Sequence, residues 1–263
     1  MIYYEKKITN PDYEWLVLFH GIGGSTNTWK YQMDAFLKEY NLFLFDFDGH
    51  GKSDIDKNKT KYKPAQMAKT LHSILKKEKI GRVNLVAFSL GTAVALEYVR
   101  QYPAHVDKMI LSGCIINIDF KKKMLCAATI CMGKVLPLKL SYSISAKILL
   151  PKKKHKKSRE YFIREAMKMH KITFTTWLHG LGGTKKQIRE YVSTINEHLI
   201  PVFFIMGNED YMFLKGVRKL KEMINHSKLH IIDHCGHGCI IEKRDIYNEL
   251  VLEYLSNYPG EKA

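Results

Sequence analysis

Short apolar segments alternate with helical patterns along most of this chain of 263 residues. The apolar segments lie at 15–20, 42–47, 83–89, 108–114, 201–207 and 229–233. Helical patterns lie between or after them, at 28–40, 64–79, 91–102, 213–225 and 241–256. Each segment is apolar throughout, which is typical of strands buried on both faces of a parallel sheet. The alternation therefore predicts an α/β fold, with a mostly parallel sheet and crossover helices.

The alternation stops between residues 116 and 198, where about eighty residues show helical and loop patterns without a convincing strand. An insertion of this length between two strands predicts a separate subdomain rather than a loop. We therefore expect a core made of residues 1–116 and 199–263, and a helical subdomain at 117–198. Apolar residues at 124–136 and 161–178 recur at spacings of three and four, which indicates amphipathic helices.

The chain carries 42 Lys and Arg against 26 Asp and Glu, a formal net charge of +16. Eighteen of the basic residues but only four of the acidic ones lie at 118–190, so the excess belongs to the inserted subdomain. A nucleic-acid binder would carry its basic surface on the main domain, and no DNA- or RNA-reading motif is present, so we expect no nucleic-acid partner. Three interpretations stay open: docking on an anionic membrane surface, attraction of an anionic substrate such as an acyl carrier conjugate, or a solvated face.

The predicted location is the cytoplasm. Hydrophobic residues make up 46% of the chain and charged residues 26%, a globular composition, and the five cysteines are an odd number that favours reduced thiols. The amino-terminal sequence has no apolar segment typical of a secretory signal. Lysines and a proline interrupt the most apolar stretch, 124–150, so we expect no transmembrane helix. A basic subdomain that docks on lipid would place the protein at the inner membrane surface.

The motif AFSLG, at 87–91, follows a buried strand and precedes a helical pattern. A serine at such a tight turn, here Ser89, holds its hydroxyl clear of the backbone, and the start of the helix favours negative charge beside it. The first small residue is Ala87, where glycine is commoner, and we regard this as a mild departure. Because serines also cap helices, the motif alone leaves a structural role open.

The glycine-rich loop HGIGGS, at 20–25, follows the first of the buried strands. A serine that attacks a carbonyl needs N–H donors for the negative oxygen of the intermediate, and the N–H groups of Ile22 and Leu90 are the candidates. The glycines do not fit the pattern of a dinucleotide loop. The segment GHGKS, at 49–53, lacks the first glycine of a phosphate loop, so both nucleotide-binding interpretations are rejected.

An acid and a base follow later strands. Asp210 lies just beyond the segment at 201–207, and His237 lies in the loop after the segment at 229–233. The carboxyl ends of parallel strands meet at one edge of the sheet, so these residues are expected to converge with Ser89. A base oriented by an acid is what an otherwise inert serine hydroxyl requires.

At this point the sequence resembles the α/β-hydrolase family, and the likeness covers essentially the whole chain outside the insertion. The matching motifs are HGIGGS at 20–25, FDFDGHGKSD at 45–54, AFSLG at 87–91, GNED at 207–210 and GHGCIIE at 236–242. The resemblance implies Ser89 as nucleophile, Asp210 as acid and His237 as general base, in the family's order. It also implies Ile22 and Leu90 as backbone donors of the oxyanion hole.

In the same terms, residues 117–198 are the cap over the pocket. His20, His50 and Ser53 are expected to support loops rather than to react. Family members usually begin with a hairpin, whereas this chain offers one strand at 2–9, so we expect seven or eight strands. Some members place the acid after the strand that precedes the cap, which makes Asp119 the alternative to Asp210.

The loop that carries the base contains His234, Cys235, His237 and Cys239. Ligands this close together, without a second group elsewhere, rarely complete a zinc site, so we expect no metal. The two cysteines are expected to be packed thiols beside the base, with sensitivity to oxidation as a consequence.

The sequence therefore predicts a serine hydrolase that cleaves a carboxylic ester, or a thioester, of an apolar acyl group through an acyl-Ser89 intermediate. No metal or organic cofactor is required. One alternative is a lyase of the kind that makes a menaquinone precursor, which uses the same three residues to remove a proton and eliminate pyruvate from an anionic substrate. The other alternative is a non-catalytic scaffold.

Overall fold

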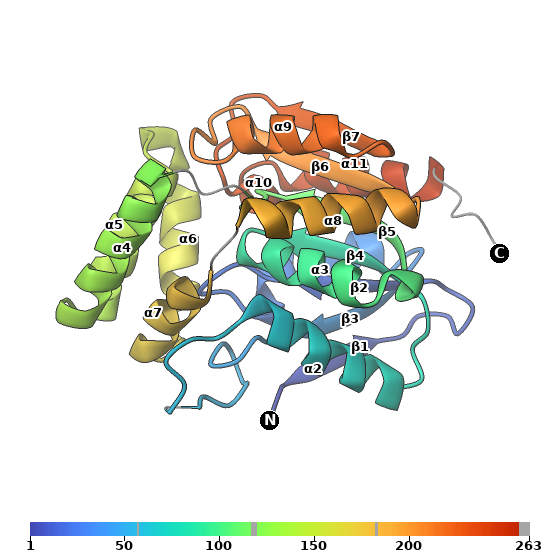
Figure 1. Cartoon of the computed structure of the whole chain (residues 1–263), viewed down its shortest axis with the longest axis horizontal. Coiled ribbons are helices and arrows are strands. Elements are labelled where there is room, and N and C mark those ends of the chain that lie inside the picture. Colours follow the sequence, from blue (N-terminus) through green and yellow to red (C-terminus); the bar gives the residue numbers. More distant parts are fainter. Residues whose placement is uncertain (57, 117–119, 182–183, 258–263) are drawn as a thin grey trace.

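A seven-stranded sheet runs through the centre of the computed structural model (Figure 1). The structure describes residues 1–56, 58–116, 120–181 and 184–257, and of 120–126 it describes the backbone alone. The strands are β1 (Tyr4–Lys7), β2 (Trp15–Phe19), β3 (Asn41–Phe45), β4 (Val83–Phe88), β5 (Val106–Ser112), β6 (Val202–Gly207) and β7 (Ser227–Ile232). Their order is β1-β3-β2-β4-β5-β6-β7, and only the β1–β3 pair is antiparallel. The predicted α/β class and mostly parallel sheet are confirmed.

Consecutive residues of the central strands are buried in two different cores. Leu16 and Leu18 of β2 pack in one cluster, and Val17 and Phe19 pack in the other, each with no exposed surface. Such side chains each stabilise the fold by roughly 1.5–3 kcal/mol. One face is covered by α2 (Pro64–Lys77), α3 (Leu90–Gln101), α8 (Lys185–Glu197) and α9 (Leu214–Met223), and the other by α1 (Met33–Phe36) and α11 (Arg244–Asn257).

The helix predicted at 28–40 is wrong in its extent. The segment forms a 3₁₀ turn, Thr26–Trp29, and the single-turn helix α1 instead. Ser25 caps the 3₁₀ turn reciprocally with Thr28, which starts the turn before the predicted position. Gln32 is then buried and its side-chain amide donates to the carbonyl of Ile240, so the chain bends at the point where a continuous helix was expected.

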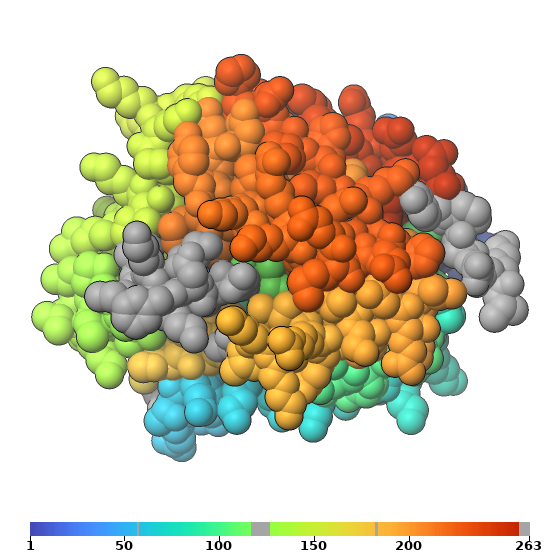
Figure 2. All heavy atoms as spheres, turned by 45° about the horizontal axis from the view of Figure 1, so that its top comes forward, coloured from blue at the N-terminus to red at the C-terminus, as the bar shows by residue number. Residues whose placement is uncertain are grey.

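The insertion between β5 and β6 is helical throughout its described part. Its helices are α4 (Phe120–Val135), α5 (Leu138–Leu149), α6 (Lys156–Ala166), α7 (Lys171–Gly180) and α8, with a 3₁₀ turn at Lys153–His155. The predicted helix at 161–178 is divided between α6 and α7. Helices α4–α7 stand together at one end of the sheet and form that end of the molecular surface (Figures 1 and 2). We call these four helices, with the 3₁₀ turn and the short segments that join them, the cap.

Helix α8 lies across the sheet beside α3 rather than with the cap (Figure 1). The predicted boundary between core and cap, at residues 117 and 198, stays a prediction. The cap has a small apolar cluster of its own, which includes Tyr142, Ala166 and Phe174. No helix in the described ranges is both long enough and apolar enough to cross a membrane.

Candidate active site

Ser89 lies between β4 and α3 with a backbone φ of 51° and ψ of −117°, a left-handed conformation that costs energy for a residue with a side chain. Gly91 follows because a Cβ there would lie 2.3 Å from the carbonyl oxygen of Phe19. The turn thus packs directly on β2. Ala87 is fully buried on β4, so its methyl group fits at the position where glycine is commoner.

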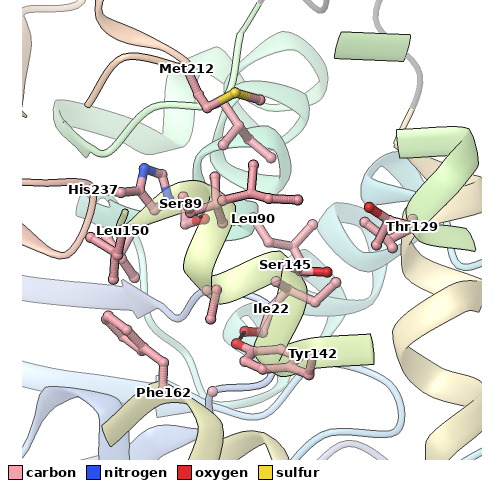
Figure 3. Close-up of a pocket in the computed structure, with 18 of the residues that line it drawn as sticks. Ile22, Ser89, Leu90, Thr129, Tyr142, Ser145, Leu150, Phe162, Met212 and His237 are labelled. Carbon is pink, nitrogen blue, oxygen red and sulfur yellow. Dashed lines mark hydrogen bonds between the residues drawn. The ribbon is translucent and has the colours of Figure 1, made fainter. Parts of the chain in front are cut away.

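The structure brings Asp210 and His237 to Ser89. His237 Nε2 lies 2.9 Å from Ser89 Oγ, and His237 Nδ1 lies 2.8 Å from Asp210 Oδ2. Asp210 follows β6, and its second oxygen accepts the backbone N–H of Phe213 at 3.1 Å. All three side chains are buried, so water competes little for these hydrogen bonds. Figure 3 shows His237 and Ser89 side by side at the pocket.

These two hydrogen bonds determine which ring nitrogen of His237 carries the hydrogen. An ionised Asp210 accepts only, so Nδ1 of His237 carries the hydrogen and donates it. Nε2 is then free to accept the hydroxyl hydrogen of Ser89. A serine, a base and an orienting acid connected in this way can generate a nucleophile at neutral pH.

Ile22 and Leu90 both line the pocket beside Ser89 (Figure 3). Leu90 is the first residue of α3, so its N–H has no acceptor within the helix. The loop around Ile22 is held from two sides: Tyr142 donates its hydroxyl hydrogen to the carbonyl of Ile22 at 2.8 Å, and Nε2 of His50 accepts the N–H of Gly23 at 3.0 Å. The use of these two peptide groups as oxyanion donors stays a prediction.

His20, His50 and Ser53 hold the surrounding loops. His20 donates from Nδ1 to the carbonyl of Gly21 at 2.7 Å and accepts the N–H of Phe47 at Nε2, at 3.0 Å. Burial lowers the pKa of His20 and lowers that of His50 well below its usual value, which keeps both rings neutral. The Ser53 hydroxyl accepts the backbone N–H of Tyr3 and donates to the carbonyl of Asp46. These contacts agree with the supporting role expected from the sequence.

A cavity of about 170 Å³ adjoins Ser89 and His237. Its lining is almost wholly apolar, and the core and the cap both contribute to it. The core side includes Ile22, Phe88, Leu90 and Met212, and the cap side includes Tyr142, Ala146, Phe162 and Phe174. Among the described lining residues there is no Lys or Arg. The cavity therefore favours an uncharged, apolar group beside the serine.

Two carboxylates next to this site received no role from the sequence. Glu242 accepts the backbone N–H groups of Gly236 and Gly238, at 3.0 and 3.1 Å, on either side of His237. Glu209, which precedes Asp210, is buried under basic side chains of the cap. The four-residue spacing between Gly238 and Glu242 was a signal for the first carboxylate. No local signal exists for the second, whose partners lie more than fifty residues away in sequence.

Cys235 and Cys239 are fully buried in the core beneath the base. Burial raises the pKa of both thiols, so the reactive thiolate is disfavoured. The structure thus argues against the predicted sensitivity to oxidation at these two positions. The alternative acid, Asp119, lies outside the described residues.

Comparisons with known proteins agree with this architecture. Residues 14–122 match the family model of the α/β hydrolase fold. A protein of Bacillus subtilis (strain 168), provisionally assigned as a 2-succinyl-6-hydroxy-2,4-cyclohexadiene-1-carboxylate synthase, is 23% identical over 93% of this chain and 91% of its own. A 2-hydroxy-6-oxononadienedioate/2-hydroxy-6-oxononatrienedioate hydrolase of Burkholderia vietnamiensis (strain G4 / LMG 22486) is 27% identical over 94% of this chain and 88% of its own.

Among solved structures, an esterase from Exiguobacterium antarcticum superposes with a TM-score of 0.83 at 20% identity, over 97% of this chain and 95% of that one. The sheet order and the strained turn at Ser89, described above, agree with this likeness. This chain is therefore a protein of the α/β-hydrolase fold, and it carries the sequence signature of that fold over residues 14–122.

Proposed function

We propose that this protein is a serine hydrolase that cleaves a carboxylic ester, or a thioester, of an apolar acyl group. The observation that carries the proposal is the hydrogen-bonded series Asp210–His237–Ser89, which ends at an apolar cavity. The series supplies a nucleophile, and the cavity supplies a place for an uncharged acyl group.

In the proposed reaction, His237 Nε2 takes the proton of Ser89 as Oγ attacks the carbonyl carbon. The new C–O bond leaves a negative oxygen, which the N–H groups of Ile22 and Leu90 stabilise by about 3–4 kcal/mol per donor. His237 then gives its proton to the departing alcohol or thiol, and the acyl group stays on Ser89. Water, deprotonated by His237, attacks the acyl-Ser89 carbonyl, and the carboxylic acid leaves. Asp210 keeps the ring in the required orientation throughout.

The cavity volume suggests the size of the acyl group. An apolar protein cavity of about 150 Å³ holds one six-carbon ring. At about 170 Å³, the cavity beside Ser89 has room for an acyl chain of about six to eight carbons or for one aromatic ring. A longer chain would extend beyond this space.

The relative from Bacillus subtilis, named as a carboxylate synthase, supports a second candidate, the pyruvate-eliminating lyase. Such an enzyme must hold an anionic substrate, and burying a carboxylate without a cationic partner is costly. The described residues that line the cavity offer no such partner, so the apolar ester is the better fit.

The decisive experiment combines a fluorophosphonate probe with a series of p-nitrophenyl esters from two to twelve carbons. We expect the wild type to be labelled, Ser89→Ala to be unlabelled, and turnover to be highest near six carbons. The matched control is Ser73→Ala, an exposed helical serine, which should behave as wild type. Absence of labelling, or equal labelling of Ser89→Ala, would overturn the proposal; labelling without turnover of any ester would favour the lyase.

For the outer face of the cap we propose contact with an anionic lipid surface. Val135, at the end of α4, and Leu140, on α5, are exposed large apolar residues, and each directly follows a lysine. Apolar side chains with neighbouring lysines are typical of helices that lie on anionic membranes. An acyl carrier protein is the alternative partner, and it would bind without any requirement for lipid.

A further inference from the structure

The cap touches both loops that carry the acid and the base. A Cβ on Gly236 would lie 2.7 Å from a methyl carbon of Leu150 and 3.0 Å from the ring of His155, and a Cβ on Gly238 would lie 2.8 Å from the ring of Phe162. The two glycines that flank His237 therefore allow cap side chains to pack directly on the loop of the base. This part of the cap is therefore in direct contact with the loop of the base.

Basic side chains of the cap also contact carboxylates of the core. Glu209 accepts hydrogen bonds from Lys152 Nζ at 2.8 Å, from Lys154 Nζ at 2.6 Å and from His155 Nε2 at 2.8 Å. His155 is completely buried, and its Nε2 also lies 3.6 Å from an oxygen of Glu242. The Nε2 edge of the His155 ring, which belongs to the cap, therefore lies between the carboxylates of Glu209 and Glu242, which belong to the core.

Glu209 and Glu242 need the hydrogen-bond donor that His155 supplies. Their side chains are only 7% and 8% exposed, and two buried negative groups that face each other repel and lose hydration. Burial alone would raise the pKa of Glu209, but the hydrogen bonds from Lys152, Lys154 and His155 outweigh that effect and hold its pKa at about 2. The basic residues of the cap therefore keep a negative charge stable directly beside Asp210.

Glu242 contacts the loop that carries the base, His237. Its two oxygens accept the N–H groups of Gly236 and Gly238, which fixes the peptide plane that follows His237 and the one that precedes Gly236. The backbone N–H of Glu209 donates to the carbonyl of Cys235 at 2.8 Å and ties the acid loop to the same segment. The distances from His237 to Asp210 and Ser89 depend on these contacts.

We propose that Glu242 and Glu209 are positioning residues for His237 and Asp210, and that Lys152, Lys154 and His155 of the cap hold them in place. We call these five residues the clasp. The clasp rests on the proposed function and extends that function. It makes the alignment of the reacting groups depend on the contact between cap and core. A misplacement of about 1 Å at the reacting groups costs roughly 10²-fold in rate.

The test compares Glu242→Ala, Glu242→Gln and the double variant Lys152→Met/Lys154→Met with Lys153→Met. Lys153 belongs to the same 3₁₀ turn, is exposed, and forms no ion pair with a described carboxylate, so its variant is the matched control. The readouts are kcat and KM on a six-carbon ester, and the downfield proton signal of His237 Nδ1–H in the NMR spectrum.

We expect Glu242→Ala to lower kcat about 10²-fold and to broaden or shift the Nδ1–H signal, with KM changed less than about threefold. Glu242→Gln keeps one accepting oxygen and should lose about tenfold, as should the double lysine variant. Lys153→Met should match the wild type. Lys152 and Lys154 are 44% and 42% exposed, so the double variant keeps the test valid if Glu242→Ala does not fold.

An unchanged signal and unchanged kcat in the folded variants would overturn the clasp. An equal loss in kcat and affinity, with the signal intact, would also overturn it, because the hydrogen bond between His237 and Asp210 would then not depend on the clasp. A wild type that neither reacts with the fluorophosphonate nor hydrolyses esters would instead contradict the proposed function. The NMR comparison tests the clasp even in that case.

Discussion

All six residues of β4, which ends directly before Ser89, are buried, whereas only three of the twelve residues of α5 in the cap are buried. The strand has neighbours on both faces and both edges, so its position is fixed by packing in every direction. The cap helix packs on a small cluster and leaves much of its surface to water. The rigid sheet is thus suited to hold reacting atoms, and the cap is suited to shape and cover the space in front of them.

The largest effect is expected in the sheet region, from Asp210→Asn. The amide would favour the wrong tautomer of His237, and kcat should fall about 10⁴-fold with little change in KM. Asp233→Asn, at the end of the neighbouring strand β7, is the control and should keep wild-type activity. The measurement is steady-state kinetics on the six-carbon ester. A fall in kcat of less than tenfold would show that Asp210 does not orient the base.

The second prediction tests whether the cap is only loosely attached. Trp177 lies on α7 of the cap but is fully buried in the main core, beside Phe47 and Tyr62, and its indole N–H donates to the carbonyl of Asp48. Trp177→Ala should lower the free energy of unfolding by about 3–5 kcal/mol. In urea unfolding, Ile172→Ala, an exposed change on the same helix, should cost far less. Equal losses would show that α7 does not anchor the cap.

The third prediction concerns acid and follows from the pKa of Glu209, which is about 2 in the folded protein against an ordinary value of 4.5. A lowered pKa contributes stability above the ordinary value, and this contribution disappears as the pH falls from about 4.5 towards 2. Urea unfolding at several pH values should show a steeper decline for the wild type than for Glu209→Gln. Parallel curves would contradict the ion pairs between cap and core.

The fourth prediction assigns substrate size to the cap. Ala146 of α5 lines the cavity, so Ala146→Leu should raise KM for an eight-carbon ester about tenfold and leave a two-carbon ester unaffected. Ser143→Leu adds bulk on the same helix outside the cavity and should not change the preference. An unchanged chain-length profile in Ala146→Leu would place the acyl group elsewhere.

The smallest effect is expected for the outer face of the cap. Sedimentation with vesicles containing anionic lipid should show binding that weakens with salt, and each of Lys139→Gln and Lys147→Gln should reduce it about fivefold. Lys219→Gln, on the core helix α9, should have no effect. Binding that ignores lipid charge and salt would rule out this docking surface.

Prediction from sequence worked best where a pattern is local and repeated. The apolar segments located the strands, and the turn at Ser89 was visible because a strand, a small residue and a helix follow each other directly. The long helix predicted at 28–40 was wrong for the same reason. The helical pattern was present, but Ser25 starts a 3₁₀ turn and the buried Gln32 bends the chain, and a periodic pattern does not contain these contacts.

By itself, the sequence determined the α/β architecture, the order of the candidate nucleophile, acid and base, and the concentration of positive charge in the insertion. Periodicity along the chain carries that information, and the topology of a parallel sheet brings its loops to one edge. Only the tertiary structure decided the volume of the cavity and the partners of the basic residues at 152–155. Lys152, Lys154 and His155 meet Glu209 across more than fifty residues, and no local pattern records which way those side chains point.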